Sequence, residues 1–123
     1  FMKFKSYEKS AVTCLLALIV GADGEIHERE LALSSLFFAK LGMTTEDLQA
    51  GEAMSSAQAF SIISGMASDK RKLVCALLGD VIMVDGDVDA REMAVWRAIS
   101  SICNFPEMNI GEAHNIVANY FGV

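Results

Sequence analysis

Apolar residues recur at helical spacing along most of the chain. One stripe comprises Val12, Leu15, Leu16 and Ile19, and a longer one comprises Leu73, Val74, Leu77, Leu78, Val81 and Ile82. Side chains three and four residues apart share one face of an α-helix, so each stripe predicts a helix with a buried face. Both stripes are followed by an Asp-Gly pair, which favours a turn.

Weaker stripes predict further helices on either side of these turns. The helices that follow the two turns are expected to end near Gly42 and before Pro106. A capped helix start at Thr45, a short stripe over residues 59–66 and an amphipathic stretch over residues 113–121 complete the pattern. The sequence therefore predicts an all-α helical bundle of about seven helices, with no strand.

The two helix–turn–helix units resemble each other in sequence. Residues 12–33 match residues 74–95, and the likeness is strongest over residues 23–32 of the first copy. We expect repeat units over about residues 12–42 and 74–104, related by an internal pseudo-two-fold axis. A chain of 123 residues has the usual size of a single domain, so residues 1–123 are expected to form one.

Both turns are acidic, with the sequences Asp23-Gly24-Glu25 and Asp85-Gly86-Asp87. Gly permits a tight or left-handed turn, and the β-branched residue that follows, Ile26 or Val88, is expected to anchor the loop to the core. The carboxylate of a Glu on the first turn of the next helix can reach back toward the loop. Hard divalent cations prefer oxygen ligands of this kind, from carboxylates and backbone carbonyls. The candidate metal ligands are Asp23, Glu25, Glu30, Asp85, Asp87 and Glu92.

This spacing equals the second half of an EF-hand calcium loop. The acids of the first half are missing, because its positions are occupied by Ile19, Gly21, Val81 and Met83. The chain therefore lacks a full EF-hand, and a metal site would have to be incomplete or take oxygens from elsewhere.

Helix capping is an alternative interpretation of the same residues. His27 or Asp89 would cap the following helix, and the Glu three residues later would close a capping box. A Glu that caps a helix cannot give both oxygens to a metal ion, so the roles of Glu30 and Glu92 stay open at this point. A lone loop histidine such as His27 is expected to be a solvated side chain rather than a ligand.

Composition and charge exclude several classes of function. The formal net charge is −6, and the main basic cluster is Lys70-Arg71-Lys72, which we interpret as a solvated helix face. Nucleic acid is therefore not an expected partner. The longest apolar run, residues 11–22, is too short for direct membrane insertion. Cys14, Cys75 and Cys103 stand in apolar stretches and are expected to be reduced and buried, which indicates a cytoplasmic protein.

No catalytic motif is recognisable in the chain. There is no phosphate-binding loop, no dinucleotide fingerprint and no supported pairing of Ser or Cys with His. We therefore expect a non-enzymatic protein without an organic cofactor. Its alternative role is a protein-interaction or homodimerisation module, which would apply if the core is too small for the large apolar side chains of Phe37, Phe38, Met43, Met54, Met66 and Met108. We expect most of these side chains to lie in the core.

The two Asp-Gly loops, each between a long apolar helix and a first-turn Glu, resemble the tellurite-resistance TerB-like family. That family is related to the N-terminal domain of DjlA-type DnaJ co-chaperones. The resemblance implies a helical bundle with a pseudo-two-fold repeat, and acidic loops that bind Ca²⁺ or another divalent cation. It also implies a place in stress or metal and tellurite response. His27 departs from the small polar residue or Asp usual at that position.

Overall fold

The computed structural model describes residues 3–25, 27–84 and 86–122, and these residues contain helices and no strand. The seven helices are α1 (Ser6–Val20), α2 (Glu28–Lys40), α3 (Thr45–Ala53), α4 (Ser56–Ser64), α5 (Ser68–Met83), α6 (Ala90–Ile102) and α7 (Ile110–Phe121). The all-α prediction of about seven helices is therefore confirmed for the described part of the chain.

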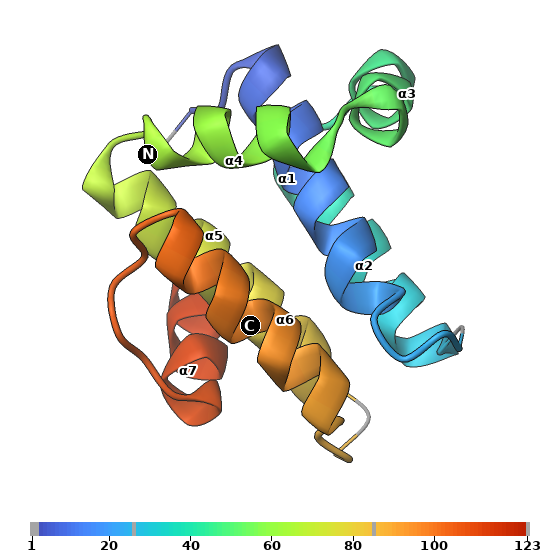
Figure 1. Cartoon of the computed structure of the whole chain (residues 1–123), viewed down its shortest axis with the longest axis vertical. Coiled ribbons are helices and arrows are strands. Elements are labelled where there is room, and N and C mark those ends of the chain that lie inside the picture. The colour runs from blue at the N-terminus through green and yellow to red at the C-terminus, as the bar shows by residue number, and fades with distance from the viewer. Residues whose placement is uncertain (1–2, 26, 85, 123) are drawn as a thin grey trace.

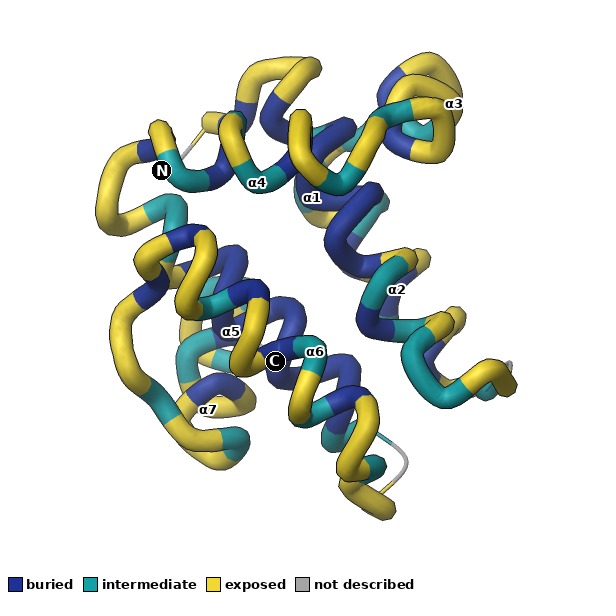
Figure 2. Tube along the Cα trace, viewed as in Figure 1, coloured by how far each residue is buried: buried dark blue, intermediate teal, exposed yellow. Residues whose placement is uncertain are grey.

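Helices α1 and α5 form the centre of the bundle (Figure 1). Every residue from Leu73 to Ile82 on α5 is buried, and so is every residue from Ser10 to Leu16 on α1. A helix that is buried on all sides must be surrounded by others. Helices α3 and α4 pack on α1, and α7 packs on α5, so the dark trace of the two central helices lies inside a mostly exposed shell (Figure 2).

Close packing between helices depends on two glycines. A Cβ atom at Gly51 on α3 would lie 2.6 Å from the backbone oxygen of Ser10 on α1. A Cβ atom at Gly79 on α5 would lie 2.5 Å from the Trp96 ring on α6. The indole N–H of Trp96 donates a hydrogen bond of 3.0 Å to the backbone oxygen of Cys75, so α6 is fixed closely against α5.

The helix ends follow the sequence with one small shift. Gly42 follows α2 with a φ of 70°, as expected for a residue that ends a helix. The cap of α3 is Thr44 rather than Thr45, because the Thr44 hydroxyl accepts the Asp47 N–H and the Asp47 carboxylate accepts the Thr44 N–H. A hydrogen bond from the Ser6 hydroxyl is the main cause that lowers the pKa of Asp47.

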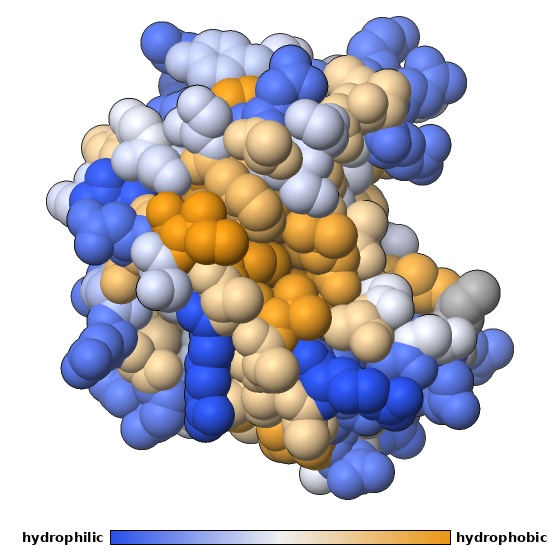
Figure 3. Space-filling model, viewed as in Figure 1, coloured by the Kyte–Doolittle hydropathy of each residue, from blue (hydrophilic) through white to orange (hydrophobic). Residues whose placement is uncertain are grey.

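Most of the large apolar residues named above are part of the core or pack against it, as expected. Phe37 and Met66 are buried, and four others pack against the core while partly buried: Phe38, Met43, Met54 and Met108. Among the described residues, the large apolar side chains that are exposed are those of Tyr7, Leu31, Leu36, Val88 and Ile102. Figure 3 shows apolar surface across the middle of one face, between α4, α1 and α6, with hydrophilic atoms around much of its edge.

The three cysteines are buried and unpaired, as the sequence indicated. Burial raises the pKa of the Cys75 thiol to about 11. This shift keeps the thiol protonated at neutral pH and makes it a poor nucleophile. No described helix is both long and apolar enough to cross a membrane.

Candidate metal centre

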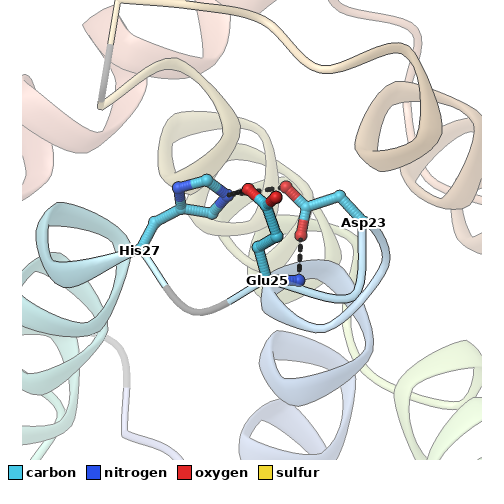
Figure 4. A group of neighbouring side chains, drawn as sticks. All are labelled: Asp23, Glu25 and His27. Atoms are coloured by element: carbon cyan, nitrogen blue, oxygen red, sulfur yellow. Dashed lines mark hydrogen bonds and ion pairs between the residues drawn. The ribbon is translucent and has the colours of Figure 1, made fainter.

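The loop between α1 and α2 is organised around Asp23. Its carboxylate accepts a hydrogen bond of 3.0 Å from the backbone N–H of Glu25, and its other oxygen lies 2.6 Å from Nε2 of His27 (Figure 4). The Asp23 side chain is only 3% exposed. The Glu25 N–H and then His27 lower the pKa of Asp23, so this carboxylate is ionised at neutral pH.

The loop between α5 and α6 is organised around Asp89. Its Oδ1 atom accepts the backbone N–H groups of Arg91 (2.7 Å) and Glu92 (3.2 Å), so Asp89 caps α6 as predicted. The Arg91 guanidinium lies 3.1 Å from Oδ2 and is the first cause that lowers the pKa of Asp89. Asp89 therefore combines a helix cap with an ion pair.

The capping boxes expected at the two helices fail for different reasons. At α2, His27 occupies the N-cap position, but its side chain makes no capping hydrogen bond, because the ring points to Asp23 instead. At α6, Asp89 caps the helix while Glu92 makes no reciprocal bond to the Asp89 backbone. The Glu92 side chain is turned into the space between the loops.

The two loops meet at one end of the bundle, at the lower right of Figure 1. Ligand atoms of Asp23, Asp89 and Glu92 all lie within 4.8 Å of one another, so the first loop faces the second. A second group, Asp23, Glu25 and His27, satisfies the same limit. Asp23 belongs to both groups, which makes it the centre of the arrangement.

Glu92 is the most unusual member of this arrangement. Glu92, on the first turn of α6, is 2% exposed. Glu30, on the first turn of α2, is 1% exposed, and its carboxyl lies beside that of Glu92. Burial is the first cause that raises the pKa of Glu92, to about 8, and the neighbouring Glu30 carboxyl is the next. Its Oε2 atom is buried without a hydrogen-bond partner among the described residues. A buried carboxylate oxygen in that state costs free energy unless a proton or cation neutralises it.

A pocket of about 740 Å³, here called the acidic pocket, opens between the two loops. Among the described residues, its lining includes six carboxylates, from Asp23, Glu25, Glu28, Asp87, Asp89 and Glu92, and two guanidinium groups, from Arg29 and Arg91. Val88 also lines the pocket and is 46% exposed, so it does not anchor the second loop to the core as expected. The corresponding Ile26 lies outside the described residues.

The structure places the predicted ligands unevenly. Asp23 and Glu92 belong to the group that joins the loops, Glu30 lies beside Glu92, and Glu25 is in the group with His27. Asp87 lines the pocket but belongs to neither group, and Asp85 lies outside the described residues. The sequence analysis gave no ligand role to Asp89 or His27. The position of His27, four residues after Asp23 across a tight turn, was the available signal.

Comparison with known proteins identifies a relative among the solved structures. No family model and no curated protein matches the chain. The chain matches the crystal structure of the protein of unknown function PG1108 from Porphyromonas gingivalis W83, with 32% sequence identity and a TM-score of 0.83. The match covers 94% of this chain and 90% of the other. The chain belongs to the same family as PG1108. This relationship supports the fold, but it gives no information on the chemistry of the pocket, because the function of PG1108 is unknown.

Proposed function

We propose that this protein is a non-enzymatic, TerB-like module that binds a divalent cation between its two acidic loops. The observation that carries the proposal is the position of Glu92, whose buried Oε2 atom has no hydrogen-bond partner among the described residues. Glu92 lies within reach of Asp23 and Asp89. Carboxylates from two separate loops then converge on one point, as the ligands of a divalent cation do.

Helix capping accounts for only part of this geometry. It explains Asp89, whose Oδ1 atom accepts two N–H groups at the start of α6. It does not explain why Glu92 is buried beside Glu30, or why Asp23 faces the opposite loop. Arg91 offers positive charge nearby, but its side chain is 63% exposed and it pairs with Asp89. A bound cation would neutralise the carboxylates that Arg91 leaves uncompensated.

The TerB-like resemblance of the sequence agrees with this role. It extends the proposal to a cytoplasmic module in stress or metal and tellurite response, with Ca²⁺ as the first ion to test. Such a module would act by changing the rigidity or surface of the loop end when the ion binds. A protein partner or a second copy of the chain would then bind the ion-loaded and ion-free forms with different affinity.

Thermal unfolding of the metal-stripped protein tests the proposal, with and without millimolar Ca²⁺, Mg²⁺ or Mn²⁺, or micromolar Zn²⁺ or Co²⁺. An ion at about 100 times its dissociation constant stabilises the folded state by about 2.7 kcal/mol, which raises the melting temperature by several degrees. The rise should disappear in the Asp23→Asn, Glu92→Gln double variant. It should persist in Glu107→Gln, which changes an exposed acid outside the acidic pocket.

The absence of stabilisation by any tested ion would contradict the proposal. The same conclusion would follow if the double variant kept the full rise. The alternative would then be a protein-interaction or oligomerisation module, and the exposed Leu31, Leu36 and Ile102 would be the first surface residues to test.

A further inference from the structure

The group in the first loop contains a nitrogen donor as well as oxygens. Nε2 of His27 lies 2.6 Å from Oδ2 of Asp23 and 3.9 Å from Oε2 of Glu25. Figure 4 shows the imidazole and both carboxylates directed toward one another. The His27 side chain is 31% exposed, and the Glu25 side chain is 73% exposed. The imidazole edge therefore faces the same space as the carboxylates, and an ion can enter from solvent.

Donor type distinguishes classes of cation. Ca²⁺ and Mg²⁺ take oxygen ligands, whereas imidazole nitrogen suits Zn²⁺, Co²⁺, Ni²⁺ and related transition metals. An oxygen-only group would select a hard ion, and a group with one nitrogen and several oxygens would select a transition metal. The His27 nitrogen is thus the feature of this pocket that bears on the choice of ion.

The buried oxygen of Glu92 is an independent sign that a ligand belongs here. Glu92 comes from the other loop, is 2% exposed and lines the same pocket, and its Oε2 atom has no hydrogen-bond partner among the described residues. It shares Asp23 with the His27 group, because Asp23 lies within 4.8 Å of both sets of ligand atoms. An ion beside Asp23 can therefore draw on nitrogen from one side and on a buried carboxylate from the other.

Resting on the proposed function, we infer that the ion of this pocket is a divalent transition metal such as Zn²⁺ or Co²⁺, with Nε2 of His27 as its nitrogen ligand. Asp23 is the shared oxygen ligand, and Glu25 or Glu92 completes the set. Ligands about 2.0–2.1 Å from a tetrahedral Zn²⁺ lie about 3.4 Å apart. The His27–Asp23 contact must therefore open by less than about 1 Å to admit the ion.

Isothermal titration of metal-stripped protein with Zn²⁺, Co²⁺ and Ca²⁺ tests the inference. The His27→Gln variant should lose at least about tenfold in affinity for Zn²⁺ and Co²⁺, while its affinity for Ca²⁺ should change by less than about twofold. Co²⁺ also gives a visible absorption spectrum that depends on its ligands, and this spectrum should differ between the native protein and His27→Gln.

The control is His114→Gln, which removes the other histidine of the chain. His114 lies on α7 and contacts Asp80, outside the acidic pocket, so this variant should bind all three ions like the native protein. Circular dichroism before each titration shows that the variants are folded. His27→Gln removes no helix-capping hydrogen bond, because the His27 side chain makes none.

Equal affinity of native protein and His27→Gln for Zn²⁺ and Co²⁺ would overturn the inference. If Ca²⁺ still bound and Glu92→Gln weakened it, the proposed cation site would stand and only the ion class would be wrong. If none of the three ions bound to native protein, both proposals would fail.

Discussion

In the loop before α6, Asp89 uses its carboxylate on the end of the helix and on Arg91. In the loop before α2, the corresponding residue is His27, whose ring lies against Asp23 instead of capping the helix. One loop is therefore fixed mainly to its own helix, and the other is fixed around Asp23, whose side chain is almost fully covered. Similar acidic sequences yield a cap in one case and a mixed nitrogen and oxygen group in the other.

The comparison also shows where the loops depend on each other. Glu30 follows the first loop and Glu92 follows the second, and the two buried carboxyls lie side by side. Neither loop could bury its Glu in this way without the other. The contact between the loops thus holds two carboxyls out of water in the metal-free protein, and a bound cation would stabilise it.

The largest effect in the metal-free protein is expected from Glu92→Gln. The folded-state pKa of Glu92, about 8, is above its ordinary value of 4.5, so the folded protein holds a proton that the unfolded chain releases. That contribution to stability is complete below pH 4.5 and is lost as pH rises through 8. Gln cannot ionise, so Glu92→Gln does not lose this stability as pH rises. The variant should be more stable than native protein at pH 8–9 by roughly 1–3 kcal/mol.

Urea unfolding at several pH values measures this effect. The native protein should lose stability between about pH 5 and pH 8, and the slope should be smaller in Glu92→Gln. Glu107→Gln, an exposed acid, should follow the native curve. A native curve that rises steadily over this range would show that Glu92 is not the buried acid described here.

An intermediate effect is expected from Gly24→Ala and Gly86→Ala. These glycines have φ values of 77° and 76°, and no atom of a described residue other than the chain neighbours lies within 4 Å of an added Cβ atom at either position. Each substitution should therefore cost only the backbone strain of a left-handed residue, about 1 kcal/mol. Thermal unfolding of the two variants should give nearly equal losses. Clearly unequal losses would mean that the loops differ in backbone as well as in side chains.

The smallest effect is expected from Arg91→Gln. The Arg91 side chain is largely exposed, so its pair with Asp89 is screened by solvent and should contribute little to stability. Removing its positive charge from the pocket should strengthen cation binding by about two- to threefold, because Asp89 loses a competing partner. Isothermal titration measures this change, and Arg97→Gln on the same helix but outside the acidic pocket is the matched control. Weaker binding in Arg91→Gln would show that the Arg91–Asp89 pair positions a ligand.

Local features of this protein were predictable because they depend on neighbours in sequence. The stripe from Leu73 to Ile82 predicted α5, and Asp89 predicted the cap of α6. The orientation of Glu92 was not predictable, because a first-turn Glu can cap its own helix or turn to another loop. The exposure of Val88 was not predictable for the same reason. Val88 lines a pocket instead of packing in the core, and part of that pocket comes from the first loop, which is distant in sequence. The internal repeat and its pseudo-two-fold axis remain predictions from the sequence.

Trp96 is the single tryptophan of the chain and lies four residues after Glu92, on the same helix face. Its buried indole, hydrogen-bonded to the Cys75 backbone, should emit at short wavelength in the folded state and shift to the red on unfolding. The protein thus carries its own fluorophore one helical turn from the acidic pocket. Occupation of the pocket and opening of the α5–α6 contact can both be followed by emission, without a label.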